Sequence, residues 1–144
     1  MTKISSILAR KGTHTTTVSP ETTVLDALKI MAEQNIGSVV VLEQGEYRGI
    51  VTERDYSRKV ILKGKHSIDT RVSEIMSSDL PSVTPEDSID LCMSLMTQKN
   101  IRYLPVFENK KLAGIISMSD VVKETIIAQK ETIHHLESYI QGQG

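Results

Sequence analysis

Hydrophobic positions along the chain change their spacing in a regular order. Between positions 24 and 31 the apolar residues recur at intervals of three and four, which is the spacing of one helix face. They are Val24, Ala27, Leu28 and Met31. Two short apolar runs follow, at 38–42 and 47–51, with Gly45 in the polar stretch between them. They predict two strands joined by a turn, and a second helix is expected to start near Thr52.

The same order returns 65 positions later. Between positions 18 and 61, 12 of 44 residues are identical to the residue 65 positions further on, without a gap. Unrelated segments of average composition would share about three. The copy predicts a helix on the apolar face Ile89, Cys92, Met93 and Met96, strands at 103–107 and 112–116, and a helix starting near Ser117. The chain is therefore a duplicated unit.

The start of each copy carries further signals. Ser19-Pro20-Glu21 and Thr84-Pro85-Glu86 predict helix starts, because proline in the first helical turn loses no hydrogen bond that the helix needs. Short strands are expected near 15–18 and 82–84. Each copy thus has the order β-α-β-β-α.

These elements predict a mixed α/β (α+β) fold in which two repeats pack through their sheets with pseudo-twofold symmetry. One repeat is too small to bury much surface alone, so both are expected to pack into one module. The expected division is 1–70 for the first repeat with the N-terminal segment and linker, and 71–144 for the second repeat with a long C-terminal helix. Residues 64–76 are interpreted as the connection.

The C-terminal helix continues the hydrophobic pattern beyond the repeat. Its apolar residues form one seam: Val122, Ile126, Ile133, Leu136 and Ile140. Such a seam can pack on its own domain. Because it extends past the repeat, a partner chain explains it better, and a homodimer whose four repeats form a flat disc is expected.

Composition narrows the function classes. The 144 residues carry 17 Lys plus Arg and 18 Asp plus Glu, a formal net charge of −1, so no overall basic field attracts nucleic acid or an anionic membrane. No apolar run approaches the roughly 18 residues of a membrane-spanning helix. The single cysteine, Cys92, excludes an internal disulfide and fits a reducing compartment; the expected location is the cytoplasm.

The most informative motifs are Gly49-Ile-Val-Thr52-Glu-Arg-Asp55 and Gly114-Ile-Ile-Ser117-Met-Ser-Asp120, each at a strand-to-helix junction. A hydroxyl residue followed three positions later by a carboxylate is close to a capping box, which satisfies free N–H groups of the helix. The same corner suits a nucleotide, because the helix N-terminus attracts phosphate and the carboxylate can accept hydrogen bonds from ribose hydroxyls. A glycine before the turn allows close approach to the backbone. The two interpretations are compatible.

With these motifs, the duplication and Ile101-Arg-Tyr-Leu-Pro-Val106, the chain resembles a tandem pair of cystathionine β-synthase (CBS) domains, also called a Bateman module. The resemblance covers about Ile7 to Ile140 and is close to stand-alone bacterial and organellar CBS-pair proteins through Thr52–Lys59 and the C-terminal helix. It implies a regulatory module that binds AMP, ADP, ATP, NADH or S-adenosylmethionine and senses energy or redox state.

The resemblance also implies two clefts between the repeats, each combining one hydroxyl–Asp motif with the entry segment and first core strand of the other repeat. The first cleft would use Thr52, Arg54, Asp55, Ser77, Val83, Arg102, Tyr103, Leu104 and Pro105. The second would use Ser117, Ser119, Asp120, Lys11, Thr16, Ile36, Gly37, Ser38 and Val39. The aspartates would hold ribose hydroxyls, and Thr52 and Ser117 would face phosphate.

Charge distinguishes the two expected clefts. Arg54 and Arg102 lie near the expected phosphate in the first, whereas Lys11 is the candidate cation of the second. Because arginine binds phosphate strongly, the first cleft is expected to favour phosphorylated ligands. Arg58 and Lys59 are interpreted as a solvated helix face. Close relatives often have His in place of Tyr103, a difference that affects the expected phosphate contacts. They often have Ile-Gly in place of Met118-Ser119, a difference that affects the space in the second cleft.

No catalytic constellation appears in the sequence. The four histidines show no metal spacing, Cys92 lies on an apolar helix face, and no Walker loop or dinucleotide motif occurs. The chain is expected to be no enzyme and to require no cofactor or metal. Its expected partners are an adenine nucleotide, a second copy and an unidentified regulated protein. Two alternatives stay open: a ligand-free assembly scaffold, and a nucleic-acid-binding module, which the charge disfavours.

Overall fold

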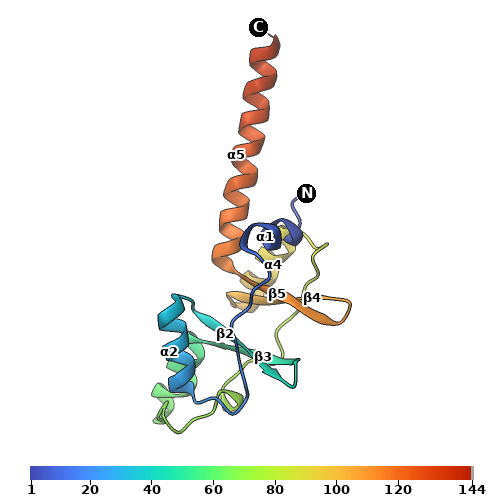
Figure 1. The fold of residues 1–144 in the computed structure, drawn as a ribbon. Helices are drawn as coiled ribbons and strands as arrows, with labels where there is room; N and C mark the ends of the chain where they lie inside the picture. Colours follow the sequence, from blue (N-terminus) through green and yellow to red (C-terminus); the bar gives the residue numbers. More distant parts are fainter. Residues whose placement is uncertain (144) are drawn as a thin grey trace. The chain divides into compact units, whose positions relative to one another are not determined.

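A computed structural model describes residues 1–143, which form five α-helices and two small sheets arranged in two compact units (Figure 1). The unit that contains the first repeat, here called the repeat-1 unit, is His14–Leu80. The repeat-2 unit combines Met1–Thr13 with the chain from Pro81 onward. The mixed α/β fold that the sequence predicts is confirmed.

The repeat-1 unit is built on a three-stranded sheet in the order β1-β2-β3. β1 pairs with β2 in parallel, and β2 pairs with β3 antiparallel. Its elements are β1 (Thr17–Val18), α2 (Val24–Gln34), β2 (Ser38–Glu43), β3 (Glu46–Thr52), α3 (Glu53–Lys59) and the short 3-10 turns η1 (Ile61–Lys63) and η2 (Val72–Glu74).

The repeat-2 unit has a two-stranded antiparallel sheet. Its elements are α1 (Ile4–Lys11), α4 (Ile89–Lys99), β4 (Tyr103–Glu108), β5 (Lys111–Ser117) and α5 (Met118–Gln143). The helix α5 runs well beyond α1 and α4, which pack on its first turns (Figure 1).

Local details repeat between the two units, as expected for a duplication. α2 and α4 each end at an asparagine in the left-handed conformation, Asn35 and Asn100, both with φ of 54°. This conformation is more accessible to asparagine than to most residues. Both hairpins also shift register at the same point, between Val41 and Leu42 and between Val106 and Phe107. The same residue types therefore impose the same backbone in both copies.

The helix starts predicted at the two proline motifs are wrong. α2 begins at Val24, where the Thr23 side chain accepts a hydrogen bond from the Asp26 N–H, and α4 begins at Ile89 after Ser88. The proline motifs instead form turns; in the first, the Thr22 N–H donates to the Ser19 carbonyl at 3.1 Å. A hydroxyl side chain caps a helix more effectively than a proline starts one, so the helices begin after the turns.

The short strand expected near 82–84 is a single bridge between Val83 and Val106, although its counterpart β1 forms. In the first repeat the Val40 N–H donates to the Thr16 carbonyl at 3.0 Å, which extends the ladder. The position equivalent to Val40 is Pro105. Proline has no N–H to donate, so this rung is missing from the second repeat.

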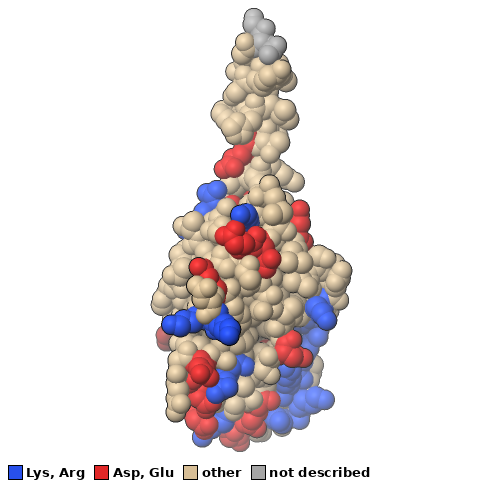
Figure 2. Space-filling model, turned by 90° about the vertical axis from the view of Figure 1, so that its right-hand side faces the viewer, with Lys and Arg blue, Asp and Glu red and all other residues tan. Residues whose placement is uncertain are grey.

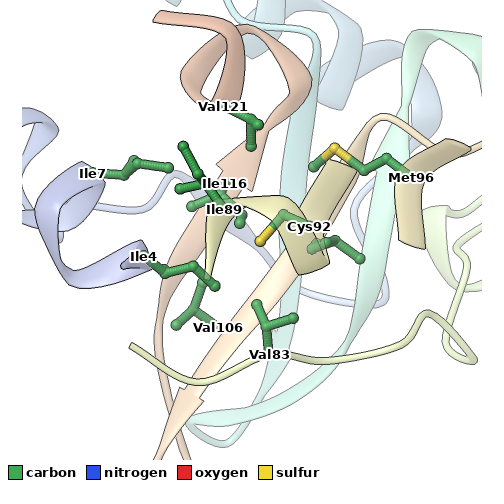
Figure 3. Packing of buried hydrophobic residues seen from close by; sticks show 10 residues of the cluster. Ile4, Ile7, Val83, Ile89, Cys92, Met96, Val106, Ile116 and Val121 are labelled. Carbon is green, nitrogen blue, oxygen red and sulfur yellow. The ribbon is translucent and has the colours of Figure 1, made fainter. Parts of the chain in front are cut away.

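The core of the repeat-2 unit includes a helix that the sequence interpretation missed. Ile4 and Ile7 of α1 are 0% and 3% exposed and pack with Cys92 and Val121 (Figure 3). Backbone bonds also tie this segment to the start of the second repeat, with the Ile4 N–H donating to Asp87 O at 2.9 Å. Ile4, Ile7 and Leu8 have helical spacing, which is the signal that identifies α1.

The segment interpreted as a connection is likewise part of a core. Val72 and Ile75 are 0% and 1% exposed and pack in the repeat-1 unit. Ser77 then pairs with Ile50 of β3 through bonds of 2.9 and 3.0 Å. The sheet of the repeat-1 unit is thus joined by the segment that precedes the second repeat. The boundary predicted between residues 70 and 71 divides the chain by repeat, whereas packing divides it after Thr13 and after Leu80.

Candidate functional site

Two strand-to-helix corners carry the predicted carboxylates. In the repeat-1 unit β3 ends at Thr52, whose hydroxyl accepts a hydrogen bond from the Asp55 N–H at 3.0 Å. The Asp55 carboxylate accepts the Thr52 N–H at 2.9 Å and lies 3.1 Å from the Thr52 hydroxyl. The capping box that the sequence suggested is therefore present, and it fixes the Asp55 side chain at the first turn of α3.

A lysine that sequence reasoning did not assign to the site completes this corner. Lys59 Nζ lies 3.0 Å from Asp55 Oδ1 and donates to the Ile75 carbonyl at 2.8 Å. Lys59, interpreted as part of a solvated helix face, is 43% exposed, and its ammonium group also pairs with the buried carboxylate of Asp55. The four-residue spacing of Asp55 and Lys59 is the signal that identifies the pair.

The corner in the repeat-2 unit has the same cap and a different cation. The Ser117 N–H donates to Asp120 Oδ2 at 2.8 Å, and the Asp120 N–H donates to the Ser117 hydroxyl at 3.1 Å. Lys11 Nζ, from the end of α1, lies 2.7 Å from Asp120 Oδ2 and donates to the Ile115 carbonyl at 2.8 Å. Lys11 was expected to face the phosphate of a ligand. In the structure it binds Asp120, the carboxylate that was expected to hold the ribose.

The electrostatics of this second corner favour an ionised carboxylate. Burial raises the pKa of Asp120, but the hydrogen bonds from Lys11 and Ser117 and the charge of Lys11 outweigh burial. The net result is a pKa below the ordinary value of 3.8. Asp120 is therefore an anion near neutral pH, as acceptance of two hydroxyl hydrogen bonds requires.

The glycine of the first motif serves the protein's own backbone. A Cβ at Gly49 would lie 2.7 Å from the Ser77 carbonyl oxygen, closer than atoms can approach. Gly49 therefore lets the Ser77 segment pair with β3 beside the Asp55 corner. Gly114 is less crowded, with Leu8 Cδ2 at 3.0 Å from such a Cβ. The atoms that come close to Gly49 and Gly114 thus belong to the segment that precedes the other repeat, Ser77 in the first case and Leu8 in the second.

The structure assigns the remaining predicted residues to one unit or the other. Ser77 joins the Thr52–Asp55 corner and Lys11 joins Asp120, so both entry residues lie in the same unit as the carboxylate they were predicted to accompany. The other partners predicted for Asp55 belong to the repeat-2 unit: Val83, Arg102, Tyr103, Leu104 and Pro105. Those predicted for Asp120 belong to the repeat-1 unit: Thr16, Ile36, Gly37, Ser38 and Val39.

The predicted site residues differ in how far their side chains are exposed, and this limits the contacts that each could make with a ligand. The side chains of Val39, Val83 and Leu104 are at most 2% exposed and lie in the two hydrophobic cores, so only their main-chain atoms are available to a ligand. Arg102 and Ser119 are exposed, and the side chains of Arg54 and Tyr103 are half-buried. Thr16 bonds Gln34 at 2.6 Å. The side chains of Arg54, Arg102, Tyr103 and Ser119 are thus at least partly accessible to solvent.

Residues 1–143 also bear on other kinds of site. In this part of the chain no group of three or more His, Cys, Asp or Glu side chains is placed to hold a metal ion. The described helices also include none with the length and apolarity to cross a membrane. A groove of about 410 Å³ in the repeat-2 unit contains none of the predicted site residues; it is lined by Thr2, Ile89, Asp90, Thr125, Ala128, Gln129, Thr132 and Ile133.

Comparison with known proteins identifies the family. The CBS domain model matches residues 6–61 and 72–126, so the chain belongs to the CBS-domain family and carries two CBS domains in tandem. It is 39% identical to the Arabidopsis thaliana mitochondrial CBS domain-containing protein CBSX3, over 98% of this chain and 73% of that protein. It is 36% identical to YhcV of Bacillus subtilis, over 82% and 84% of the two chains.

A solved structure shows the same architecture. A protein with CBS domains from Burkholderia ambifaria has a TM-score of 0.85 and 45% identity, covering 89% of this chain and 96% of that one. The resemblance found in the sequence is thereby confirmed. CBS pairs are generally regulatory modules, rather than catalytic ones, that bind adenosine ligands and often form oligomers.

Proposed function

We propose that this protein is a regulatory module that binds an adenine nucleotide and senses energy or redox state through ligands such as AMP, ADP, ATP or NADH. Its membership of the CBS family supports the class. The observation that carries the proposal is the pair of corners in which a capped helix start presents an aspartate, Asp55 in one unit and Asp120 in the other. The module is proposed to act without catalysis by changing its contact with a regulated protein.

The chemistry of the corners fits a ribose. Each aspartate uses one oxygen to accept a backbone N–H, and a carboxylate has further lone pairs for two sugar hydroxyls. Lys59 and Lys11 now occupy part of that capacity, but their side chains are 43% and 36% exposed. Both lysines are long and partly exposed, so each can turn towards solvent while the ribose hydroxyls supply hydrogen bonds to the carboxylate that it leaves. The diol would then replace an ammonium group at each carboxylate.

The corners are proposed to differ in their preference for phosphate. Arg54 belongs to the first turn of α3, and Arg102 is exposed just before β4; both were expected to contact the phosphate of the Asp55 ligand. Lys11, the cation expected for the other site, already binds Asp120 and the Ile115 carbonyl. Arginine binds phosphate in a bidentate manner, so the Asp55 site should hold phosphorylated ligands more tightly.

The test is thermal unfolding of the full chain with AMP, ADP, ATP, NADH and S-adenosylmethionine, each at millimolar concentration. A ligand present at about 100 times its dissociation constant should add roughly 2.7 kcal/mol to the free energy of unfolding. Asp55→Asn should abolish the stabilisation contributed by the first site, because the amide cannot accept both hydroxyl hydrogen bonds while bonding the backbone.

Asp26→Asn is a matched control for this experiment. Thr23-Val-Leu-Asp26 repeats the spacing of Thr52-Glu-Arg-Asp55 at another helix start in the same unit, and its carboxylate is exposed. This variant should retain the full ligand response. If none of the five compounds raises the unfolding temperature, the ligand-free assembly scaffold replaces the proposal. If the Asp55→Asn, Asp120→Asn double variant responds like the unmodified protein, the assigned sites are wrong.

Two further expectations belong to this proposal. The cytoplasm is the proposed location, since the lone cysteine is buried and unpaired among the described residues; the relative CBSX3 is named as mitochondrial, so microscopy of the tagged full-length protein must decide. Nucleic-acid binding would require an affinity that falls steeply with salt and is insensitive to Asp55→Asn. The net charge of −1 disfavours it.

A further inference from the structure

The helix α5 carries apolar side chains that its own unit leaves exposed. They are between 45% and 68% exposed: Val122, Ile126, Ile133, Leu136, Tyr139 and Ile140. On the other side of the helix Val121 and Glu124 are 0% and 4% exposed, because that side packs on α1 and α4. α5 is thus attached to its unit by one face and presents a second apolar face to solvent.

The spacing of the exposed face is that of a coiled coil. Starting at Val122, the residues on this face follow alternating intervals of four and three: Val122, Ile126, Gln129, Ile133, Leu136 and Ile140. This is a heptad repeat in which Ile126, Ile133 and Ile140 occupy all three a positions. The d positions hold Val122, Gln129 and Leu136. A period of 3.5 residues keeps the face turned towards a partner helix, and isoleucine at a followed by leucine at d, which favours two strands, occurs at Ile133 and Leu136.

The distal half of α5 also requires something to stabilise it. From Gln129 to Gly142 every residue is exposed and none belongs to a hydrophobic core; the first turn of this half only borders the groove beside Ile89, and Arg10 Nη2 lies 3.8 Å from Glu131. The helix then continues past α1 and α4 (Figure 1). An isolated helix of this length is marginal in water, because helices in proteins draw their stability chiefly from packing an amphipathic face. The segment also contains Thr132, Ser138 and Gly142, which favour a helix less than alanine or leucine do. A partner along the apolar face would supply the missing packing.

Charge selects the partner and its direction. The described part of α5 has two lysines and three glutamates, and few charged side chains lie on its projecting part (Figure 2). An anionic membrane surface would require a basic polar face. In a parallel pair, Thr125 faces the partner's Lys130 and Thr132 faces the partner's Glu137, so like charges do not meet. An antiparallel pair would place Lys130 against Lys130 and Gln129 against Ile133.

We infer that α5 binds α5 of a second copy as a parallel, in-register, two-stranded coiled coil along Val122–Ile140. The two Gln129 side chains face each other and can exchange amide hydrogen bonds, which holds the register as a polar core residue does in other coiled coils. The inference is independent of nucleotide binding. It places the two repeat-2 units of a dimer side by side at the same end of the coil.

The experiment is disulfide cross-linking of the full chain. Leu136→Cys lies at a d position, where equivalent residues of a parallel pair approach within disulfide distance, whereas Ser138→Cys two residues later faces outward. Leu136→Cys should form a covalent dimer at least roughly tenfold faster than Ser138→Cys under mild oxidation. The native Cys92 should not interfere, because burial and the charge of Asp87 raise the pKa of its thiol to about 11. The unmodified protein serves as the blank.

Sedimentation equilibrium provides the second measurement. Ile133→Asp puts a charge in the seam and should raise the dimer dissociation constant by roughly tenfold or more, with a loss of helical signal in circular dichroism. His134→Asp, one position along on the outer face, should change neither. Equal cross-linking of the two cysteine variants overturns the parallel coil, and so does a monomeric unmodified protein. Co-sedimentation of that protein with phosphatidylcholine–phosphatidylglycerol vesicles would instead assign the face to a membrane.

Discussion

At the scale of single residues, the two corners keep their aspartates and differ in the cation that pairs with each. Lys59 reaches Asp55 from within the same helix, whereas Lys11 reaches Asp120 from a helix 109 positions earlier in the chain. The residue equivalent to Lys59 in the second repeat is Glu124, which is buried and binds Arg10 at 3.0 Å. The duplication therefore preserved the carboxylate that a ligand would need and exchanged the charges around it.

Lys11→Met tests the contribution of the second corner to stability. The folded protein lowers the pKa of Asp120, so the pairing stabilises the fold above the ordinary carboxyl pKa of 3.8 and is lost as pH falls through the folded pKa. Near neutral pH the variant should lose less than about 1 kcal/mol, since the pair is partly exposed.

In strong acid the Lys11→Met variant and the unmodified protein should become equally stable. Urea unfolding at several pH values measures the difference. Lys3→Met, which breaks a more exposed pair with Glu86, is the control and should show a smaller pH-dependent difference. A Lys11→Met effect that grows as pH falls would show that Asp120 is not held as an anion by this lysine.

At the scale of elements, α1 is joined to α5 by a polar contact as well as by apolar packing. Arg10 Nε lies 3.0 and 3.3 Å from the two oxygens of Glu124, whose side chain is 5% exposed. The arginine remains half-exposed. Because Glu124 is buried, loss of Arg10 would leave a desolvated anion, which costs more than loss of an exposed ion pair.

Arg10→Ala should therefore lower the free energy of unfolding by about 1–3 kcal/mol. Arg48→Ala removes an exposed arginine that pairs with Glu43 at 3.1 Å, and it should cost no more than about 1 kcal/mol. Chemical denaturation of both variants near neutral pH measures the difference. Adding Glu124→Gln to Arg10→Ala should restore part of the lost stability, since no unpaired charge then remains. Equal losses in the two arginine variants would contradict this account.

At the scale of the whole molecule, each compact unit is completed by the segment that precedes the other repeat. Ile4 and Ile7 fill the core of the repeat-2 unit, and Val72 and Ile75 fill that of the repeat-1 unit. The repeat-1 unit is the continuous segment His14–Leu80, which extends past its own repeat, whereas the repeat-2 unit needs the separate segment Met1–Thr13. The stability of each unit should depend on a residue outside its own repeat.

Ile4→Ala should destabilise the repeat-2 unit by about 2–5 kcal/mol through loss of a fully buried side chain. Hydrogen exchange measured by mass spectrometry should show the larger loss of protection in α4, β4 and β5. Val72→Ala, equally buried in the other core, should instead affect β2 and β3. Leu62→Ala, at a side chain that is 76% exposed, should affect neither. Loss of protection near β2 in the Ile4→Ala variant would contradict the assignment of α1.

Local signals determined most of the elements and the duplicated plan. Apolar spacing placed α2, α4 and the two hairpins, because the side chains that define each face lie only a few residues apart. The Thr52–Asp55 and Ser117–Asp120 caps were equally visible, since every partner is local. The same reasoning mistook the proline motifs for helix starts, because the competing hydroxyls of Thr23 and Ser88 lie only three residues further along.

Contacts between residues that are far apart in the sequence were decided by the tertiary structure alone. The pairing of Lys11 with Asp120, the bond between Arg10 and Glu124, and the position of Ser77 beside Gly49 join residues 28 to 114 positions apart. Hydrophobic spacing shows that Ile4 and Val72 need burial, but burial is non-directional and does not name the core that receives them. That choice follows from which sheet edge and which helix face remain open once both repeats have folded.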